Sequence, residues 1–289
     1  MARRESVGMT VSLLVPSSLC REAADKREAT HKVGLVARAA TVFRVDRVAV
    51  FPDSDGDRRW GGGFVSTVLR YAATAPYLRK EAWGTRDELE QAGVLPPLRA
   101  VSRTGSESQG SGSSRQGIVT EVGPDGRVRV NCGLQHPISL VDPTDVGLDE
   151  GERVTVRISS REPVRARIVD EPLPGFAVER ADLSAALGRE DAGLRIATSR
   201  HGQALTTERL GALAGRVEGG MTVAFGAPER GLPAVVGIDE ASVASADGET
   251  GSDPDGFNRW LDTVPNQGSE VVRTEEAVFA TLACLTLPR

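Results

Sequence analysis

Short apolar runs alternate with amphipathic stretches at both ends of the chain. Residues 10–15 and 47–51 are rich in β-branched side chains and predict two strands. Between them, residues 22–44 place Ala, Val and Phe at helical spacing with Arg and Lys on the opposite side, which predicts an amphipathic helix. Ser17 or Ser18 is expected to cap this helix, because a serine oxygen accepts from the free N–H groups of a first turn.

Glycine and proline punctuate the segment that follows. Another helix is expected to start within residues 61–71, and residues 76–80 and 92–98 are expected to be connectors shaped by proline. Residues 104–114 read TGSESQGSGSS, a polar stretch without large apolar side chains. Such a stretch has nothing to bury in a core, so it predicts a flexible linker.

After this linker the apolar pattern changes from helical to alternating. Five short β-like runs follow, at residues 117–121, 127–131, 138–141, 153–158 and 164–169. Turn sequences at 124–126 and 149–151 separate some of them. Five closely spaced strands predict a small barrel of the OB type.

The helix and strand pattern resumes from residue 171. Residues 1–103 and 171–289 are therefore expected to form the two parts of one α/β domain. The linker 104–114 and the barrel 115–170 are expected to be an insertion between them. The predicted fold class is α/β, with a parallel sheet, flanking helices and an inserted β-barrel.

Three segments of the last third of the chain share a pattern typical of ligand-binding loops. Residues 196–202 (IATSRHG) and 223–232 (VAFGAPERGL) each join an apolar run to a polar loop that contains glycine. Residues 263–277 (TVPNQGSEVVRTEEA) join a turn to an acidic helix start. In α/β proteins such loops follow the carboxyl ends of strands, where ligands bind.

Composition narrows the class of protein. The chain has 289 residues, of which 39% are apolar and 26% charged, as in ordinary soluble proteins. No apolar run reaches the length of a membrane span, and residues 11–15 are too short for a secretory core. We therefore expect a cytoplasmic protein without a membrane. Three widely spaced cysteines argue against a disulfide framework and a cysteine zinc site, and no metal site is predicted.

Charge is unevenly distributed along the chain. Residues 1–100 carry 16 Lys and Arg against 12 Asp and Glu, whereas residues 171–289 carry 10 against 18. A basic end beside an acidic end is compatible with an RNA-binding face, and also with a chance imbalance of solvated charges. Lys is rare, and residues 239–257 form an acidic stretch without it, which is typical of a salt-adapted or GC-rich source.

Six blocks in order carry a resemblance to a known family. They are HKVGLVARAA (31–40) with FRVDR (43–47), APYLRK (75–80), GVLPPL (93–98), ATSRHG (197–202), FGAPERGL (225–232), and VPNQG (264–268) with VRTEEA (272–277). The chain resembles a SPOUT-class RNA methyltransferase of the archaeal and eukaryotic branch that has an OB-like insertion. This resemblance covers nearly the whole chain. It implies a C-terminal trefoil knot, an S-adenosylmethionine site in the knot, and a homodimer.

The chain departs from this family pattern in two places. The linker 104–114 looks expanded with Gly and Ser, and the stretch 239–257 looks like an acidic insertion. Neither touches one of the six blocks, so neither weakens the resemblance.

The resemblance, together with the loop chemistry, predicts the cofactor site. Gly226 and Gly231 allow close backbone approach, and Phe225 and Leu232 are expected to line a slot for adenine. Residues 198–202 and 264–268 are expected to supply the remaining walls. The predicted cofactor-binding residues are Thr198, Ser199, Gly202, Phe225, Gly226, Gly231, Leu232, Val264, Asn266 and Gly268.

Methyl transfer to a uridine N3 or a ribose hydroxyl requires loss of a proton from the attacking group. A base, or a cation that stabilises the developing anion, is therefore needed. Arg200 and Arg273 are the candidate cations. Glu229 and Glu275 are the candidate bases or the carboxylates that orient those arginines, although a carboxylate in the first turn of a helix is also favoured by the helix dipole.

Basic residues outside the three loops are candidates for RNA contact, and a solvated basic helix face explains them equally well. They are Lys32, Arg38, Arg44, Arg79 and Lys80 in the N-terminal part, and Arg127 and Arg129 in the barrel. Residues 115–170 contain no Phe, Tyr or Trp, so base stacking there would have to use arginine planes.

The last helix, expected over residues 273–285, has an apolar face at Ala277, Val278, Thr281, Leu282 and Leu285. We expect this face to pack in the core and in a homodimer whose partner directs Arg38 or Arg44 toward the methyl group.

The leading hypothesis is an S-adenosylmethionine-dependent RNA methyltransferase that acts on uridine N3 of ribosomal RNA. The alternatives are ribose 2′-O methylation and a non-catalytic, RNA-binding assembly factor.

Overall fold

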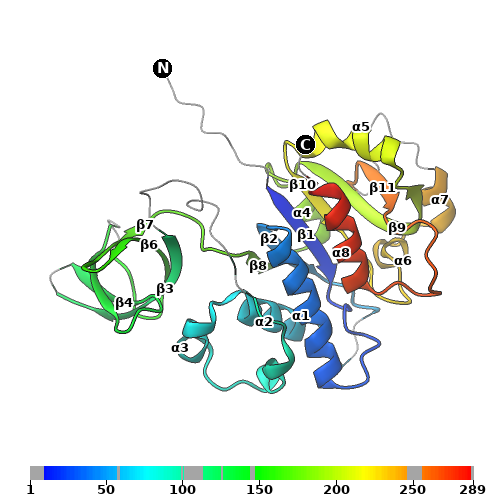
Figure 1. The fold of residues 1–289 in the computed structure, drawn as a ribbon. Coiled ribbons are helices and arrows are strands. Elements are labelled where there is room, and N and C mark those ends of the chain that lie inside the picture. Colours follow the sequence, from blue (N-terminus) through cyan, green and yellow to red (C-terminus); the bar gives the residue numbers. More distant parts are fainter. Residues whose placement is uncertain are drawn as a thin grey trace.

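A six-stranded parallel sheet, built from both ends of the chain, organises the larger part of the molecule (Figure 1). The computed structural model describes residues 10–56, 59–98, 100, 113–124, 126–143, 147–245 and 256–287. The strand order is β11-β9-β10-β1-β2-β8. The strands are β1 (Val11–Pro16), β2 (Arg47–Phe51), β8 (Ala177–Arg180), β9 (Leu194–Ala204), β10 (Met221–Ala224) and β11 (Arg259–Asp262). The predicted parallel sheet is thus confirmed.

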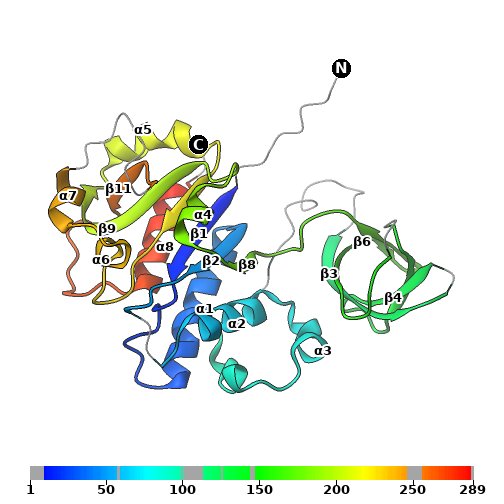
Figure 2. The same cartoon turned by 180° about the vertical axis from the view of Figure 1, so that it is seen from behind.

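Helices cover both faces of this sheet, because side chains alternate along each strand. Leu13 and Val15 of β1 pack in one buried cluster with α1 (Lys26–Val42), α2 (Gly62–Ala73), α5 (Thr207–Val217) and α8 (Thr274–Leu285). Leu14 packs on the opposite face with α4 (Leu183–Leu187), α6 (Leu232–Val236) and α7 (Glu240–Ser245). The view from behind in Figure 2 shows this second layer.

Helix α1 begins later than the apolar spacing predicts. Asp25 is its N-cap and accepts a hydrogen bond from the Glu28 amide at 2.8 Å, so the helix starts at Lys26 rather than at residue 22. The predicted caps have another role. Ser18 donates its hydroxyl hydrogen bond to Asp53, and the hydroxyl of Ser17 accepts one from the Asp53 amide.

The five strands expected in the middle of the chain are present and form one antiparallel sheet in the order β5-β4-β3-β6-β7. They are β3 (Ser113–Val122), β4 (Arg127–Asn131), β5 (Ile138–Val141), β6 (Arg153–Arg161) and β7 (Val164–Val169). The OB assignment stays a prediction. The predicted linker lies outside the described residues, except for its last two, Ser113 and Ser114, which belong to β3 and correct its boundary.

Gln116 of β3 attaches the small sheet to the α/β part. Its side chain is almost fully buried and accepts a hydrogen bond from the Ala75 amide at 2.9 Å. It also donates to the carbonyl of Ala73, the last residue of α2, at 3.0 Å. The Tyr77 hydroxyl donates to the Gln116 carbonyl at 2.9 Å, and the Tyr77 ring covers Gly133 so closely that a Cβ there would lie 2.8 Å from it.

Short helices occupy both of the connectors predicted around proline, and part of the acidic stretch is also helical. The first predicted connector contains η1 (Pro76–Leu78) and leads into α3 (Arg79–Trp83). The turns η2 (Asp87–Leu89) and η3 (Ala92–Val94) follow. The acidic stretch 239–257 contains α7, and its residues 246–255 lie outside the described part.

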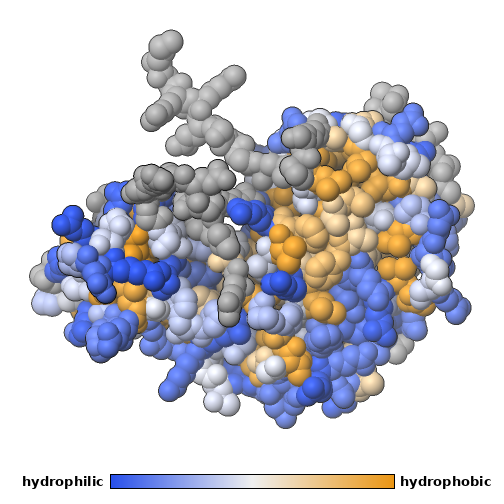
Figure 3. All heavy atoms as spheres, viewed as in Figure 1, coloured by the Kyte–Doolittle hydropathy of each residue, from blue (hydrophilic) through white to orange (hydrophobic). Residues whose placement is uncertain are grey.

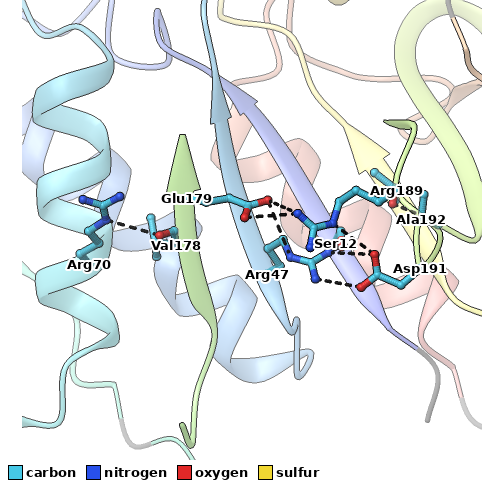
Figure 4. A network of polar contacts seen from close by, with 9 residues as sticks. Ser12, Arg47, Arg70, Val178, Glu179, Arg189, Asp191 and Ala192 are labelled. Carbon is cyan, nitrogen blue, oxygen red and sulfur yellow. Dashed lines mark hydrogen bonds and ion pairs between the residues drawn. The ribbon is translucent and has the colours of Figure 1, made fainter. Parts of the chain in front are cut away.

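An ion-pair network ties the sheet together at Arg47, the first residue of β2 (Figure 4). Arg47 contacts Asp191 at 2.8 Å and Glu179 of β8 at 3.7 Å, and Arg189 bridges the same two carboxylates. The hydrogen bond from Arg47 is the main reason that the pKa of Asp191 lies below its ordinary value. Among the described residues, no helix is long and apolar enough to cross a membrane.

Candidate functional site

A pocket of about 350 Å³ lies along the carboxyl edge of the parallel sheet, within the size range of small-molecule sites. Its walls come from segments that are far apart in sequence. They are Arg21 after β1, residues 198–201 in β9, residues 225–234 after β10, Glu240 of α7, and residues between Asp262 and Ala277 around the end of β11 and the start of α8. Residues from all three of the loop segments singled out in the sequence therefore line one pocket.

The loop after β10 folds back on itself in a tight turn. Ala227 and Arg230 exchange backbone hydrogen bonds of 3.0 and 3.1 Å across Pro228 and Glu229. Glu229 has a φ of 59°, a left-handed conformation that is unusual for a residue other than glycine. Gly226 lies so close to the far side of the loop that a Cβ would be 2.3 Å from the Leu232 amide nitrogen.

A large bulge in β9 carries the first loop. Ala197 pairs with Trp260 and Gln203 pairs with Leu261, so the register with β11 skips residues 198–202. Thr198 anchors the bulge by donating a hydrogen bond to the Ala224 carbonyl at 2.9 Å. Gly202 is not on the pocket wall. It allows close packing of the two strands, because a Cβ would lie 2.8 Å from the Leu261 backbone.

The third loop reaches the pocket from the end of β11. Val264 and Gln267 line the wall, whereas the predicted residues Asn266 and Gly268 do not. Thr274, the first residue of α8, donates a hydrogen bond of 2.8 Å to the Gly226 carbonyl. This bond joins the third loop to the second and fixes the position of one pocket wall relative to the other.

Seven of the ten predicted cofactor residues line this pocket. They are Thr198, Ser199, Phe225, Gly226, Gly231, Leu232 and Val264. Phe225 and Leu232 are fully buried and provide the apolar part of the wall. Gly226 and the neighbouring backbone provide polar atoms within a narrow space. This combination suits a flat heterocycle with a hydrogen-bonding edge.

The four predicted catalytic residues fall into two pairs. Arg200 and Glu229 line the pocket and are exposed. Arg200 directs its Nε toward His201 Nε2 at 3.1 Å, and His201 lies 3.2 Å from Glu240. Arg273 precedes α8, is exposed, and is not among the lining residues.

Glu275 has a different environment from the one predicted. It is 3% exposed and faces α1, where its carboxylate lies 3.5 Å from the Lys32 ammonium. It does not line the pocket, so it is not available there as a base or as a partner for Arg200 or Arg273. The prediction for Glu275 is wrong because helix α8 turns this side chain into the core.

Lys32 is likewise not a phosphate contact. Its side chain is 2% exposed and forms ion pairs with Glu22 and Glu275. A cation buried in this way is not accessible to an RNA backbone. Its two carboxylates explain why a lysine is tolerated in the core, since buried charges require partners.

The other predicted RNA contacts are divided among several surfaces. Arg79 is turned inward, because its guanidinium donates to the carbonyls of Ala72 and Thr74, and burial lowers its pKa. Arg38 donates to the Pro97 carbonyl at 3.0 Å. In the small sheet, Arg127 donates hydrogen bonds to Ser139, and Arg129 forms an ion pair with Glu121. The side chains of Arg44 and Lys80 are exposed.

Asp53, which follows β2, fixes the pocket loop but escapes the sequence patterns. It is 3% exposed and accepts hydrogen bonds from Arg230 Nε at 3.1 and 3.2 Å. Arg230 in turn donates to the Ala234 carbonyl at 3.2 Å. The only signal that could have found Asp53 is its position directly after a predicted strand.

Asp262 is a second carboxylate that the sequence patterns miss, and unlike Asp53 it lines the pocket. It is the last residue of β11, and its Oδ1 accepts a hydrogen bond from the Val264 amide at 3.1 Å. Burial raises the pKa of Asp262, while the bond from Val264 acts in the opposite direction. A carboxylate with a raised pKa is a stronger base than an exposed one.

Comparison with known proteins gives concordant results. The model of a family described as "Putative RNA methyltransferase" matches residues 10–285. An uncharacterised protein of Haloarcula marismortui is 68% identical over 96% of this chain and 99% of its own length. One of Halobacterium salinarum is 66% identical over the same shares. The human 28S rRNA (uridine-N(3))-methyltransferase is 26% identical over 96% of this chain and 77% of its own length.

Proposed function

Because the chain belongs to the RNA methyltransferase family whose model spans residues 10–285, we propose that it methylates N3 of a uridine in ribosomal RNA, with S-adenosylmethionine as the methyl donor. The family makes the chain an enzyme that transfers methyl groups. The choice of uridine N3 rests on human, mouse and fruit-fly relatives, each bearing the name 28S rRNA (uridine-N(3))-methyltransferase.

The residues on the pocket wall fit S-adenosylmethionine. The observation that carries the proposal is the convergence of Phe225, Leu232 and Val264 with the narrow backbone turn at Gly226, at the carboxyl edge of the sheet. The three apolar side chains would hold adenine, and the backbone around Gly226 would meet its polar edge. The acidic wall residues Glu229 and Asp262 favour a positively charged sulfonium.

The donor supplies an electrophilic methyl group. Held by Phe225, Leu232 and Val264, it would give this methyl carbon to the lone pair of uridine N3, and the electron pair of the broken carbon–sulfur bond would stay on sulfur. The N3 proton must pass to a base. We assign this role to Asp262, because burial raises its pKa, and Glu229 is the second candidate on the wall.

This assignment predicts the pH dependence of methylation. Only the ionised carboxylate of Asp262 accepts a proton, and its pKa lies above the ordinary value for Asp. The rate is therefore expected to fall about tenfold for each pH unit below that raised pKa. Asp262→Asn is expected to remove this acidic limb, and Glu229→Gln to retain it. An unchanged acidic limb in Asp262→Asn, measured by single-turnover methylation, contradicts the role of Asp262.

The finer features of the site and assembly are also proposals. Arg200 is proposed as a cation near the transferred methyl group, and Arg273 as one that approaches only after RNA binds. We also propose a trefoil knot in the C-terminal part, an OB-type barrel that binds RNA, and a cytoplasmic location. Arg157, Arg165 and Arg167 line a concavity of the small sheet that suits RNA phosphates. The haloarchaeal relatives favour the interpretation of a salt-adapted source.

A twofold homodimer is proposed on a revised surface of α8. Thr281 and Leu285, two of the residues expected at the interface, are buried inside their own chain and are not available to a partner. The outward side of α8 is nonetheless apolar, with Phe279, Ala280 and Ala283 partly or fully accessible. Figure 3 shows apolar atoms gathered over this helix. Sedimentation at high salt tests the dimer.

Methyl transfer by the purified protein tests the proposed function. The substrate is ribosomal RNA from a strain that lacks this gene, and the donor carries a labelled methyl group. We expect label in 3-methyluridine after digestion to nucleosides. Label in a 2′-O-methylnucleoside supports the ribose alternative. Donor binding by calorimetry without any transfer supports the non-catalytic assembly factor.

A further inference from the structure

Arg21 lines the pocket and stands out among the three arginines on its wall. Arg230 is held by Asp53 and by the Ala234 carbonyl, so its guanidinium serves the loop itself. Arg200 is exposed and contacts His201. The Nε of Arg21, in contrast, is buried and has no hydrogen-bond partner within the described part of the chain.

The backbone around Arg21 is fixed by its neighbours. The Arg21 amide donates to the Ser18 carbonyl at 2.9 Å in the turn after β1. Cys20 is fully buried beneath α1, and Glu22 forms an ion pair with the buried Lys32. Lys32 also pairs with Glu275 in the first turn of α8, the helix whose first residue holds Gly226. Arg21 is therefore anchored to the same framework as the pocket loops.

A buried N–H of a cation without a partner carries a desolvation cost. Nε itself is shielded from the pocket, so a ligand there meets the part of Arg21 that borders the open space and offsets this cost by pairing with the cation. A guanidinium offers paired N–H groups that match the oxygens of a carboxylate, a phosphate or an anionic uracil edge. The ligand group that meets Arg21 should thus be an oxygen anion.

The position of Arg21 in the sheet indicates which ligand supplies that anion. The proposed adenine slot is formed by the loops after β10 and β11 and the bulge of β9. Arg21 follows β1, which lies on the other side of β10 in the strand order. It therefore borders the flank of the pocket that the cofactor slot leaves free, where the second ligand would sit.

We propose that Arg21 binds the nucleotide substrate through an oxygen anion, either a phosphate or the uracil oxygen that gains charge as N3 loses its proton. This inference rests on the proposed function, because it takes the second ligand to be a nucleotide. It adds to the site a residue from the turn after β1, in addition to those of the three C-terminal loops.

Two readouts test the role of Arg21, with Arg216→Ala as the matched control on the exposed side of α5. The first is binding of uridine 5′-monophosphate in the presence of S-adenosylhomocysteine, followed by NMR, which does not need turnover. We expect Arg21→Ala to bind at least about tenfold more weakly than the wild type, the scale of a lost charged hydrogen bond, and Arg21→Lys to fall between them. Arg216→Ala is expected to bind as the wild type does.

The second readout is methylation of ribosomal RNA. A fall in kcat of about 100-fold in Arg21→Ala at unchanged KM indicates the uracil oxygen, and a rise in KM at unchanged kcat indicates a phosphate. Both results support the proposal. Equal nucleotide binding by the wild type and Arg21→Ala, or a loss confined to S-adenosylmethionine affinity, overturns it. If the wild type binds the nucleotide but methylates no RNA, the proposed function fails while the binding readout still decides the role of Arg21.

Discussion

Replacing Lys32 with methionine is expected to lower the free energy of unfolding by about 3–5 kcal/mol, the cost of leaving buried carboxylates without their cation. Lys32 is the shared partner of Glu22 and Glu275, and the Glu275 side chain is only 4% exposed. The second oxygen of each carboxylate lacks a hydrogen-bond partner among the described residues. Loss of the Lys32 ammonium therefore removes the cation that compensates both charges. Chemical denaturation of the purified variants measures the effect.

Two further variants make the test specific. Lys80→Met removes a lysine that is exposed on α3, and its effect is expected to stay within about 0.5 kcal/mol. Adding Glu275→Gln to Lys32→Met is expected to restore part of the lost stability, because the second change removes one unpaired charge. Equal stability of Lys32→Met and the wild type would falsify the assignment of Lys32 to the core and return it to the candidate RNA contacts.

Adding one methyl group at Gly226 is expected to reduce the affinity for S-adenosylmethionine at least about 100-fold, near the upper end of the cost of overpacking a tight site. The Cβ of Gly226→Ala would lie 2.3 Å from the Leu232 nitrogen and 2.7 Å from the Gly231 carbonyl carbon. Backbone on both sides of the turn must therefore move. The substitution therefore changes the shape of the loop as well as the space beside it.

Gly211→Ala is the matched control for this substitution. Gly211 lies on the exposed side of α5, and a Cβ there meets no atom within 4 Å. This control is expected to keep its affinity and to gain up to about 1 kcal/mol of stability, because alanine favours a helix over glycine. Calorimetry with S-adenosylmethionine measures both variants. Wild-type affinity in Gly226→Ala would place the donor away from this turn.

Local patterns were sufficient to predict most of the framework. The bounds of β2, β4, β5 and β7 agree with the residues predicted from alternation and turn sequences. The pocket loops were also predictable, because Gly226 and Gly231 follow a short buried strand at the edge where ligands bind in α/β proteins. These signals depend on neighbours in the sequence.

The errors arose where distant segments meet. Lys32 lies on an amphipathic helix rich in basic residues, and only the packing of α8 against α1 shows that it is buried beside Glu275. Gly202 resembles a ligand-loop glycine, yet it allows β9 to approach Leu261 of β11. Arg21 and Asp262 became candidates only once the sheet order brought the ends of β1 and β11 to one edge. Such long-range contacts have no periodic signature in a single sequence.

Modified nucleosides in ribosomal RNA test the central claim most directly. RNA from a strain lacking this gene is compared by mass spectrometry with RNA from the same strain carrying either the wild-type gene or the Gly226→Ala gene. The account predicts that a 3-methyluridine is lost on deletion, returns with the wild-type gene, and does not return with Gly226→Ala. An unchanged content of 3-methyluridine in the deletion strain, at every position of the ribosomal RNA, contradicts the account.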